Sequence, residues 1–197
     1  MFRFGPRRLG WLTAILLAFA VGGGVARGQE ADEYYVKAAL LAKIPAFIEW
    51  PKNAMPGDDK TFYIGIVGPS PFGDHLKTLE MQQVKNKQIV VRRFATIKEY
   101  LPCHLLFISN VKEKDEGAAQ RLTNSLEKTK DQPLLLITDS EGLAEKGAVI
   151  NFYLEGSNVK IEMNRDAEKR AGLTTSAQFL SIIERNGRFV KRAKEGN

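Results

Sequence analysis

The sequence contains very little cysteine and histidine, which limits the chemistry that it can perform. Cys103 is the single cysteine among 197 residues, so an intramolecular disulfide is excluded and the core alone must hold the fold. The two histidines are His75 and His104. Because adjacent side chains of a strand point to opposite faces, Cys103 and His104 are not expected to share a metal ion. We expect a buried thiol, a half-buried His104, no metal site and no cofactor.

Catalytic motifs are also scarce. Gly68 and Gly73 have the spacing of the outer glycines of a P-loop, but Asp74 and His75 stand where lysine and serine or threonine are needed. The GxSxG and SxxK motifs of serine hydrolases do not occur. A hydrolase assembled from distant residues would need one of the two histidines as its base. We therefore predict no catalytic residues, and binding or regulation is favoured over an enzymatic function.

Only one long apolar run is present, Leu9–Val21, and it lies near the N-terminus. Arg3, Arg7 and Arg8 precede it, Gly22, Gly23 and Gly24 end it, and Ala26-Arg27-Gly28 offers small residues at the two positions that a signal peptidase recognises. This order is typical of a secretory signal peptide, whereas a membrane-spanning helix needs roughly 20 apolar residues. The alternative is an uncleaved membrane anchor. We predict a cleaved signal peptide over residues 1–28, and a periplasmic protein that starts at Gln29.

The net charge follows from this assignment. The whole chain carries +6, but the four arginines of the signal peptide leave with it, which reduces the net charge to +2. The basic character of the chain therefore belongs mostly to the leader. Nucleic-acid binding, which would need a basic patch on the domain itself, is not predicted.

Strand and helix patterns alternate along the rest of the chain. Runs rich in β-branched, leucine and aromatic residues predict strands at 61–67, 88–93, 104–109, 133–138, 149–154 and 159–163. Helical spacing predicts helices over 33–50, 72–80, 115–128, 165–171 and 176–185. Pro45 should kink the first of these helices, and Thr174 or Thr175 should cap the last.

This alternation predicts an α/β fold. Strand–helix–strand units give a three-layer domain with a mainly parallel sheet of about five or six strands. The last two strands should form an antiparallel hairpin at the sheet edge, with the face of Lys160, Glu162 and Asn164 in water. We assign residues 29–185 to this single domain and 186–197 to a solvated basic tail.

A small-ligand site is one hypothesis for the function. Ligands of parallel sheets bind at the carboxyl ends of the strands, where Gly68, Ser70 and Asp139 are expected. Asp139 also suits a simpler role as the cap of a short helix that ends at Gly147. These three residues are the ligand-binding candidates.

Several blocks of the sequence, in order, resemble the YfiR-like family of exported proteins. The first is Lys37–Leu41 followed by Phe47–Pro51, and the later blocks are Ile64–Gly68, Cys103–Ile108, Leu135–Asp139, Gly147–Phe152, Ile161–Asn164 and Ala171–Leu173. The resemblance implies a periplasmic regulator that represses an inner-membrane diguanylate cyclase by binding its periplasmic sensor domain. That action lowers cyclic di-GMP and restrains biofilm formation. The resemblance also implies an outer-membrane-associated partner that sequesters the regulator, and dimers in some members.

Two stretches are the candidate partner-binding sites. A tryptophan at the end of a helix is a good interface anchor, which selects Phe47, Glu49 and Trp50. The second stretch, where the hairpin meets a helix, contributes Asn164, Arg165 and Leu173. The simpler alternatives are a core position for Trp50 and a helix N-cap for Asn164.

Overall fold

The computed structural model describes residues 23–52, 60–110, 117–129 and 132–190. Its main sheet has the strand order β10-β8-β7-β6-β5-β2-β4-β3, and β1 and β9 form a separate two-stranded sheet. The bounds of the strands are β1 Ile48–Glu49, β2 Thr61–Val67, β3 Gln83–Val84, β4 Lys87–Phe94, β5 Leu105–Ile108, β6 Leu135–Thr138, β7 Ile150–Glu155, β8 Asn158–Met163, β9 Thr174–Thr175 and β10 Arg188–Phe189. The five strands β4, β2, β5, β6 and β7 run parallel, which confirms the predicted mainly parallel sheet.

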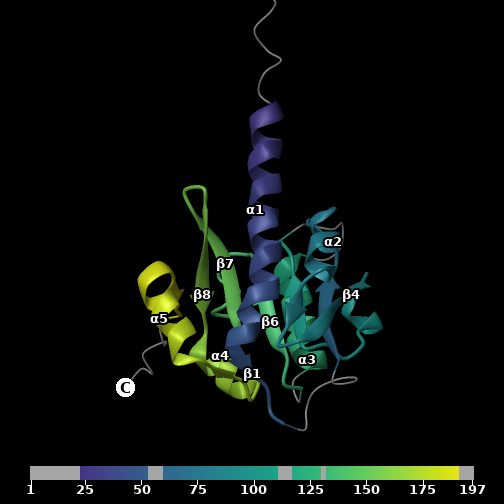
Figure 1. The fold of residues 1–197 in the computed structure, drawn as a ribbon, viewed down its shortest axis with the longest axis vertical. Coiled ribbons are helices and arrows are strands. Elements are labelled where there is room, and N and C mark those ends of the chain that lie inside the picture. Colours follow the sequence, from purple (N-terminus) through teal and green to yellow (C-terminus); the bar gives the residue numbers. More distant parts are fainter. Residues whose placement is uncertain (1–22, 53–59, 111–116, 130–131, 191–197) are drawn as a thin grey trace, which may run out of the picture.

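Helices cover both faces of the sheet, so the predicted three-layer α/β architecture is confirmed (Figure 1). Side chains of α1, α2 and α5 pack on one face, and those of α3 and η2 pack on the other. The bounds are α1 Gly23–Lys43, η1 Ile44–Phe47, α2 His75–Glu80, η2 Ile97–Glu99, α3 Ala118–Lys128, α4 Arg165–Arg170 and α5 Ala177–Asn186. Among the described residues, no helix has the length and apolar character needed to cross a membrane.

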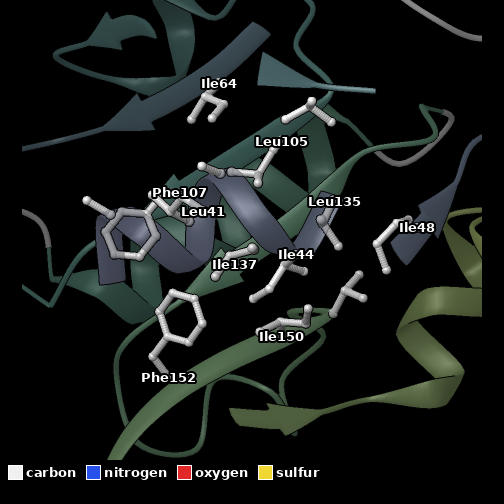
Figure 2. Packing of buried hydrophobic residues seen from close by; sticks show 14 of the residues in the cluster. Leu41, Ile44, Ile48, Ile64, Leu105, Phe107, Leu135, Ile137, Ile150 and Phe152 are labelled. Carbon is white, nitrogen blue, oxygen red and sulfur yellow. The ribbon is translucent and has the colours of Figure 1, made fainter. Parts of the chain in front are cut away.

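Alternation along the central strands builds the two halves of the core. Leu105 and Phe107 of β5 face α1, while Leu106 and Ile108 of the same strand face α3. All four are buried, as a strand covered on both faces requires. In Figure 2, Leu41 and Ile44 lie over the aliphatic side chains of the central strands.

The first helix differs from its prediction over 33–50. α1 ends at Lys43, and the 3-10 turn η1 follows it. Pro45 is the second residue of this turn, where its missing N–H costs no intrahelical hydrogen bond. Pro45 therefore marks the end of the α-helix rather than a kink within it. α1 also begins at Gly23, so cleavage after Gly28 would shorten it to Gln29–Lys43.

The sheet edge and the wet face of the hairpin were both predicted wrongly. β7 and β8 do form the antiparallel hairpin, but β10 pairs in parallel with β8 and covers its edge. β10 comes from the segment assigned to a solvated tail. Glu162 is buried, and its carboxylate accepts hydrogen bonds from Arg188 Nε at 2.6 Å and Asn151 Nδ2 at 3.3 Å.

Two helix caps also differ from the sequence-based expectation. Ser176 caps α5, since its side chain accepts from the Phe179 N–H, while Thr174 and Thr175 form β9. Residues 141–147 form turns rather than a short helix, so Asp139 caps no helix there.

Candidate partner-binding site

The first candidate stretch forms a corner of the domain immediately after α1. Within η1, Ile44 and Pro45 are buried, and the next residues turn into the extended strand β1. Trp50 precedes Pro51, and a residue in that position avoids the helical region. The two prolines thus keep the chain from continuing the helix, and Phe47, Glu49 and Trp50 lie in the segment that crosses the end of the domain.

The two candidate stretches, far apart in sequence, lie side by side. β1 pairs antiparallel with β9, with Ile48 opposite Thr175 and Glu49 opposite Thr174. The Ser176 N–H donates to the Phe47 carbonyl at 2.9 Å. A Cβ on Gly172 would stand 3.5 Å from Pro51 Cγ. β1 and α4 accordingly share the lower end of the molecule in Figure 1. We call Phe47, Glu49, Trp50, Pro51, Arg165, Gly172 and Thr174 the corner surface, and the exposed cations Lys52, Lys169 and Arg170 its rim.

Two aromatic side chains of the corner surface are half-buried. Phe47 stacks on Phe179 of α5, with ring centroids 5.3 Å apart. The Trp50 ring is nearly perpendicular to the rings of Phe62 and His104, with ring centroids 5.6 Å and 6.3 Å apart. Trp50 is therefore both a packing residue and a surface residue. Its Nε1 is buried without a hydrogen-bond partner among the described residues.

The candidates near α4 divide into scaffold and surface. Asn164 is the N-cap of α4: its Oδ1 accepts from the Asp166 and Ala167 N–H groups, and its Nδ2 donates to the Ala144 carbonyl at 2.7 Å. Leu173 packs in the core. Arg165 is partly exposed and pairs with the buried Glu168 carboxylate at 2.7 Å. Among the six predicted partner residues, Phe47, Glu49, Trp50 and Arg165 can touch a partner, whereas Asn164 and Leu173 hold the surface in place.

The corner surface and its rim have a positive bias. Within positions 49–52 and 165–172, the cations Lys52, Lys169 and Arg170 and the acid Glu49 are exposed, and the acid Asp166 is partly exposed. No described acid pairs with these three cations. An apolar centre with a cationic rim suits a partner surface that is apolar in its middle and acidic around it.

The ligand-binding candidates lie at the opposite end of the sheet, where the space is filled by protein. Asp139 Oδ2 accepts from Lys37 Nζ at 2.8 Å and from Tyr34 OH at 2.9 Å, and Oδ1 accepts from the Asn110 N–H at 2.7 Å. Lys37 is only 2% exposed and also pairs with Glu33. The predicted capping role of Asp139 is therefore wrong, because this carboxylate anchors α1 to the sheet.

Gly68 and Ser70 are partly exposed, but protein atoms fill the space on their inner side. Gly68 has φ +81°, and a Cβ there would stand 2.9 Å from Arg121 Cδ and Nε. The Arg121 side chain is fully buried and donates from Nη2 to the Ser109 carbonyl at 2.9 Å. The Oγ atom of Ser70 is buried. Arg121, Lys37 and Tyr34 thus occupy the space at the carboxyl ends of the strands, where a ligand was one hypothesis from the sequence.

The side chains of Cys103 and His104, considered from the sequence as possible reactive groups, are both buried in uncharged form. Burial raises the pKa of the Cys103 thiol to about 12, which keeps it protonated and a poor nucleophile. Burial lowers the pKa of His104 to about 4, with nearby Lys87 and Arg92 adding to the shift. His104 is fully buried rather than half-buried, and its Nδ1 accepts from the Tyr63 N–H at 2.9 Å. No cluster of three metal-binding side chains occurs within the described ranges.

Sequence reasoning missed the buried charges that position this architecture. Arg121 lies on a helix face otherwise occupied by apolar or small side chains, and Lys37 lies among apolar side chains with Glu33 four residues before it. A cation among apolar side chains of a helix is the sequence signal for a buried charge, but it does not identify the residue in the next layer that neutralises the charge. Both cations bind groups that follow strands β5 and β6, and their contacts depend on the tertiary structure.

Comparison with known proteins identifies the fold and a family. The profile of the YfiR/HmsC-like family matches residues 34–182. Among solved structures, a conserved domain protein from Vibrio cholerae is 12% identical, and an ABC domain in complex with L-Trp from Streptococcus pneumoniae is 10% identical, both with a TM-score of 0.50. Each match covers 80% of this chain but 60% of the other, so this chain spans less than two thirds of their length and shares the fold alone. A search of curated proteins gave no match.

Proposed function

The chain belongs to the YfiR/HmsC-like family of regulatory proteins, and from this premise we propose that it is an exported, non-enzymatic regulator that works by protein contact. In this proposal it acts in the periplasm after loss of residues 1–28. It binds the periplasmic sensor domain of an inner-membrane signalling protein. The target is a diguanylate cyclase, so that binding lowers cyclic di-GMP and restrains biofilm formation.

The observation that carries the proposal is the corner surface. Interface anchors are aromatic side chains that are held rigidly and surrounded by polar groups. Phe47 and Trp50 meet this description, since each is fixed by ring contacts on its inner side and half-exposed on its outer side. Lys52 and Lys169 supply charges that no described acid neutralises.

The environments of His104 and Cys103 support a non-enzymatic role. Of the two histidines that could serve as the base of a hydrolase, His104 is buried, uncharged and hydrogen-bonded to a backbone N–H. His75 is partly exposed, and its ring contacts that of Tyr35. Cys103 is a buried, protonated thiol on the opposite face of the segment that carries His104. Neither His104 nor Cys103 can approach a substrate without local unfolding.

Release completes the regulatory cycle in this proposal. An outer-membrane-associated protein sequesters the regulator, and a homodimer is a further assembly consistent with the family. In this proposal the sequestering protein and the second copy each compete with the sensor domain for the corner surface. A partner that covers Trp50 would therefore displace the sensor domain.

The proposal is tested by affinity capture from detergent-solubilised inner membranes with the purified protein from Gln29 onward as bait, and mass spectrometry of the retained proteins. We expect to recover a membrane protein with a periplasmic sensor domain and a cyclase domain. Because the rim of the corner surface is cationic, the recovery should decrease as the ionic strength rises.

A charge-reversed bait makes this experiment specific. Lys52→Glu with Lys169→Glu changes the rim of the corner surface, while Lys98→Glu changes an exposed cation on η2, on the other face of the sheet. The first variant should lose the partner and the second should keep it. Equal capture by both variants, or no capture by folded, monodisperse bait, contradicts the proposal.

A further inference from the structure

A cleft of about 360 Å³ lies at the amino ends of β6 and β7, at the end of the sheet opposite Gly68 and Asp139. Its walls come from the end of α3, the turn at 141–147 and α4. The described lining residues are Leu126, Thr129, Gln132, Leu134, Leu136, Lys146, Gly147, Val149, Ala167, Arg170 and Ala171. A volume of this size lies within the range of small-molecule sites.

The floor and the mouth of the cleft differ in character. Leu134, Leu136 and Val149 form a buried apolar floor. Lys146 and Arg170 are the charged lining residues, and both are exposed. Arg170 Nη2 lies 3.9 Å from the position that a Cβ on Gly147 would occupy, so the guanidinium reaches across toward the turn that carries Lys146.

The glycine in this wall is required for the shape of the cleft. Gly147 has φ +121°, a conformation that side-chain-bearing residues rarely adopt. A Cβ at this position would also stand 3.0 Å from Leu126 Cδ1. The turn can therefore approach α3 closely while the space in front of Arg170 is left open.

The charges are unbalanced among the described residues that line the cleft. These residues include no acid, and the ion pairs of the described ranges include neither Lys146 nor Arg170. Gln132 adds a neutral donor, because Tyr100 OH donates to its Oε1 and leaves Nε2 for another acceptor. An apolar floor beneath two cations and an amide is complementary to an organic anion with an apolar body.

We propose that this cleft binds a small organic anion whose apolar part covers Leu134 and Leu136 and whose carboxylate pairs with Arg170 and Lys146. The site adjoins the corner surface, because Arg170 lines the cleft and also belongs to the cationic rim of that surface. Binding of such a ligand needs no partner protein, so this proposal can fail or hold independently of the proposed regulatory function.

The test is isothermal titration calorimetry of the purified protein with 4-phenylbutyrate as the probe and 4-phenylbutanamide as its uncharged counterpart. We expect saturable binding of one phenylbutyrate per chain, and binding of the amide weaker by roughly tenfold or more, the value of a charged hydrogen bond. The dissociation constant for phenylbutyrate should rise with salt.

Variants of neighbouring residues localise the binding. Arg170→Gln should weaken phenylbutyrate binding by roughly tenfold, while Lys169→Gln, a change of the adjacent exposed cation outside the cleft, should leave it unchanged. Ala171→Leu narrows the cleft and should abolish binding, with the thermal midpoint measured to confirm folding. The proposal is overturned if phenylbutyrate does not bind, if the amide binds as well, or if Arg170→Gln and Lys169→Gln behave alike.

Discussion

Replacement of Asp139 by alanine should destabilise the protein strongly, because this carboxylate neutralises a buried cation. Asp139 accepts three hydrogen bonds, from Lys37, Tyr34 and the Asn110 backbone, and its side chain is inaccessible to solvent. Removal of one partner of a buried ion pair costs about 3–5 kcal/mol of unfolding free energy. Glu33 remains beside Lys37, so we expect a loss near the lower end, about 3 kcal/mol.

Urea denaturation followed by circular dichroism measures this loss. With a slope of about 2 kcal/mol per molar urea, the midpoint should fall by roughly 1.5 M. Asp74→Ala is the matched control, because Asp74 and Lys77 also form an ion pair at 2.9 Å, but with side chains 90% and 82% exposed. Its midpoint should not change measurably, since exposed pairs are screened by water.

A triple variant separates the buried charge from the lost hydrogen bonds. Lys37→Met combined with Glu33→Gln and Asp139→Ala removes all three charges of the cluster, so it should be less destabilised than Asp139→Ala alone. Equal midpoints for Asp139→Ala and Asp74→Ala would refute the role of this pair as the anchor of α1.

Two further predictions follow from the other buried groups. Because the pKa of His104 is lowered from 6.5 to about 4 in the fold, the unfolded chain binds more protons between these values. Stability from neutral His104 should thus be complete above pH 6.5 and should be lost as the pH falls toward 4; His104→Leu should flatten this part of the profile of unfolding free energy against pH. Cys103 should resist Ellman's reagent at pH 8 in the native protein and react fully in urea, because burial raises its pKa to about 12. Fast reaction of the native thiol would contradict the buried position.

Elements with a strong local pattern could be predicted from the sequence. β2 was expected at 61–67, where it lies, and β5, β6 and α3 lie inside their expected ranges. Their β-branched, leucine or helix-spaced residues determine the element within a few neighbours. The two-residue strands β1, β9 and β10 carry no such pattern, because they exist only through pairing with a distant segment.

The candidate sites show the same division. Trp50 and Arg165 could be selected by residue type and by position at the ends of elements, but their common surface depends on the β1–β9 pairing. Asp139 was expected to cap a helix, since a carboxylate after a strand often does so. Its true partner, Lys37, stands more than 100 residues earlier. The cleft beside α4 gave no signal, because its lining comes from segments that meet only in the folded chain.

Photocrosslinking from the corner surface tests the central claim most directly. A p-benzoylphenylalanine placed at Glu49, which is exposed beside Trp50, should crosslink the protein in intact cells to an inner-membrane sensor protein. The same probe at Met81, which is 81% exposed after α2, should give no such product. Neither substitution disturbs a buried side chain, so both proteins should fold. A crosslink to the sensor protein from position 81 and not from position 49 would contradict the assignment of the corner surface as the partner-binding site.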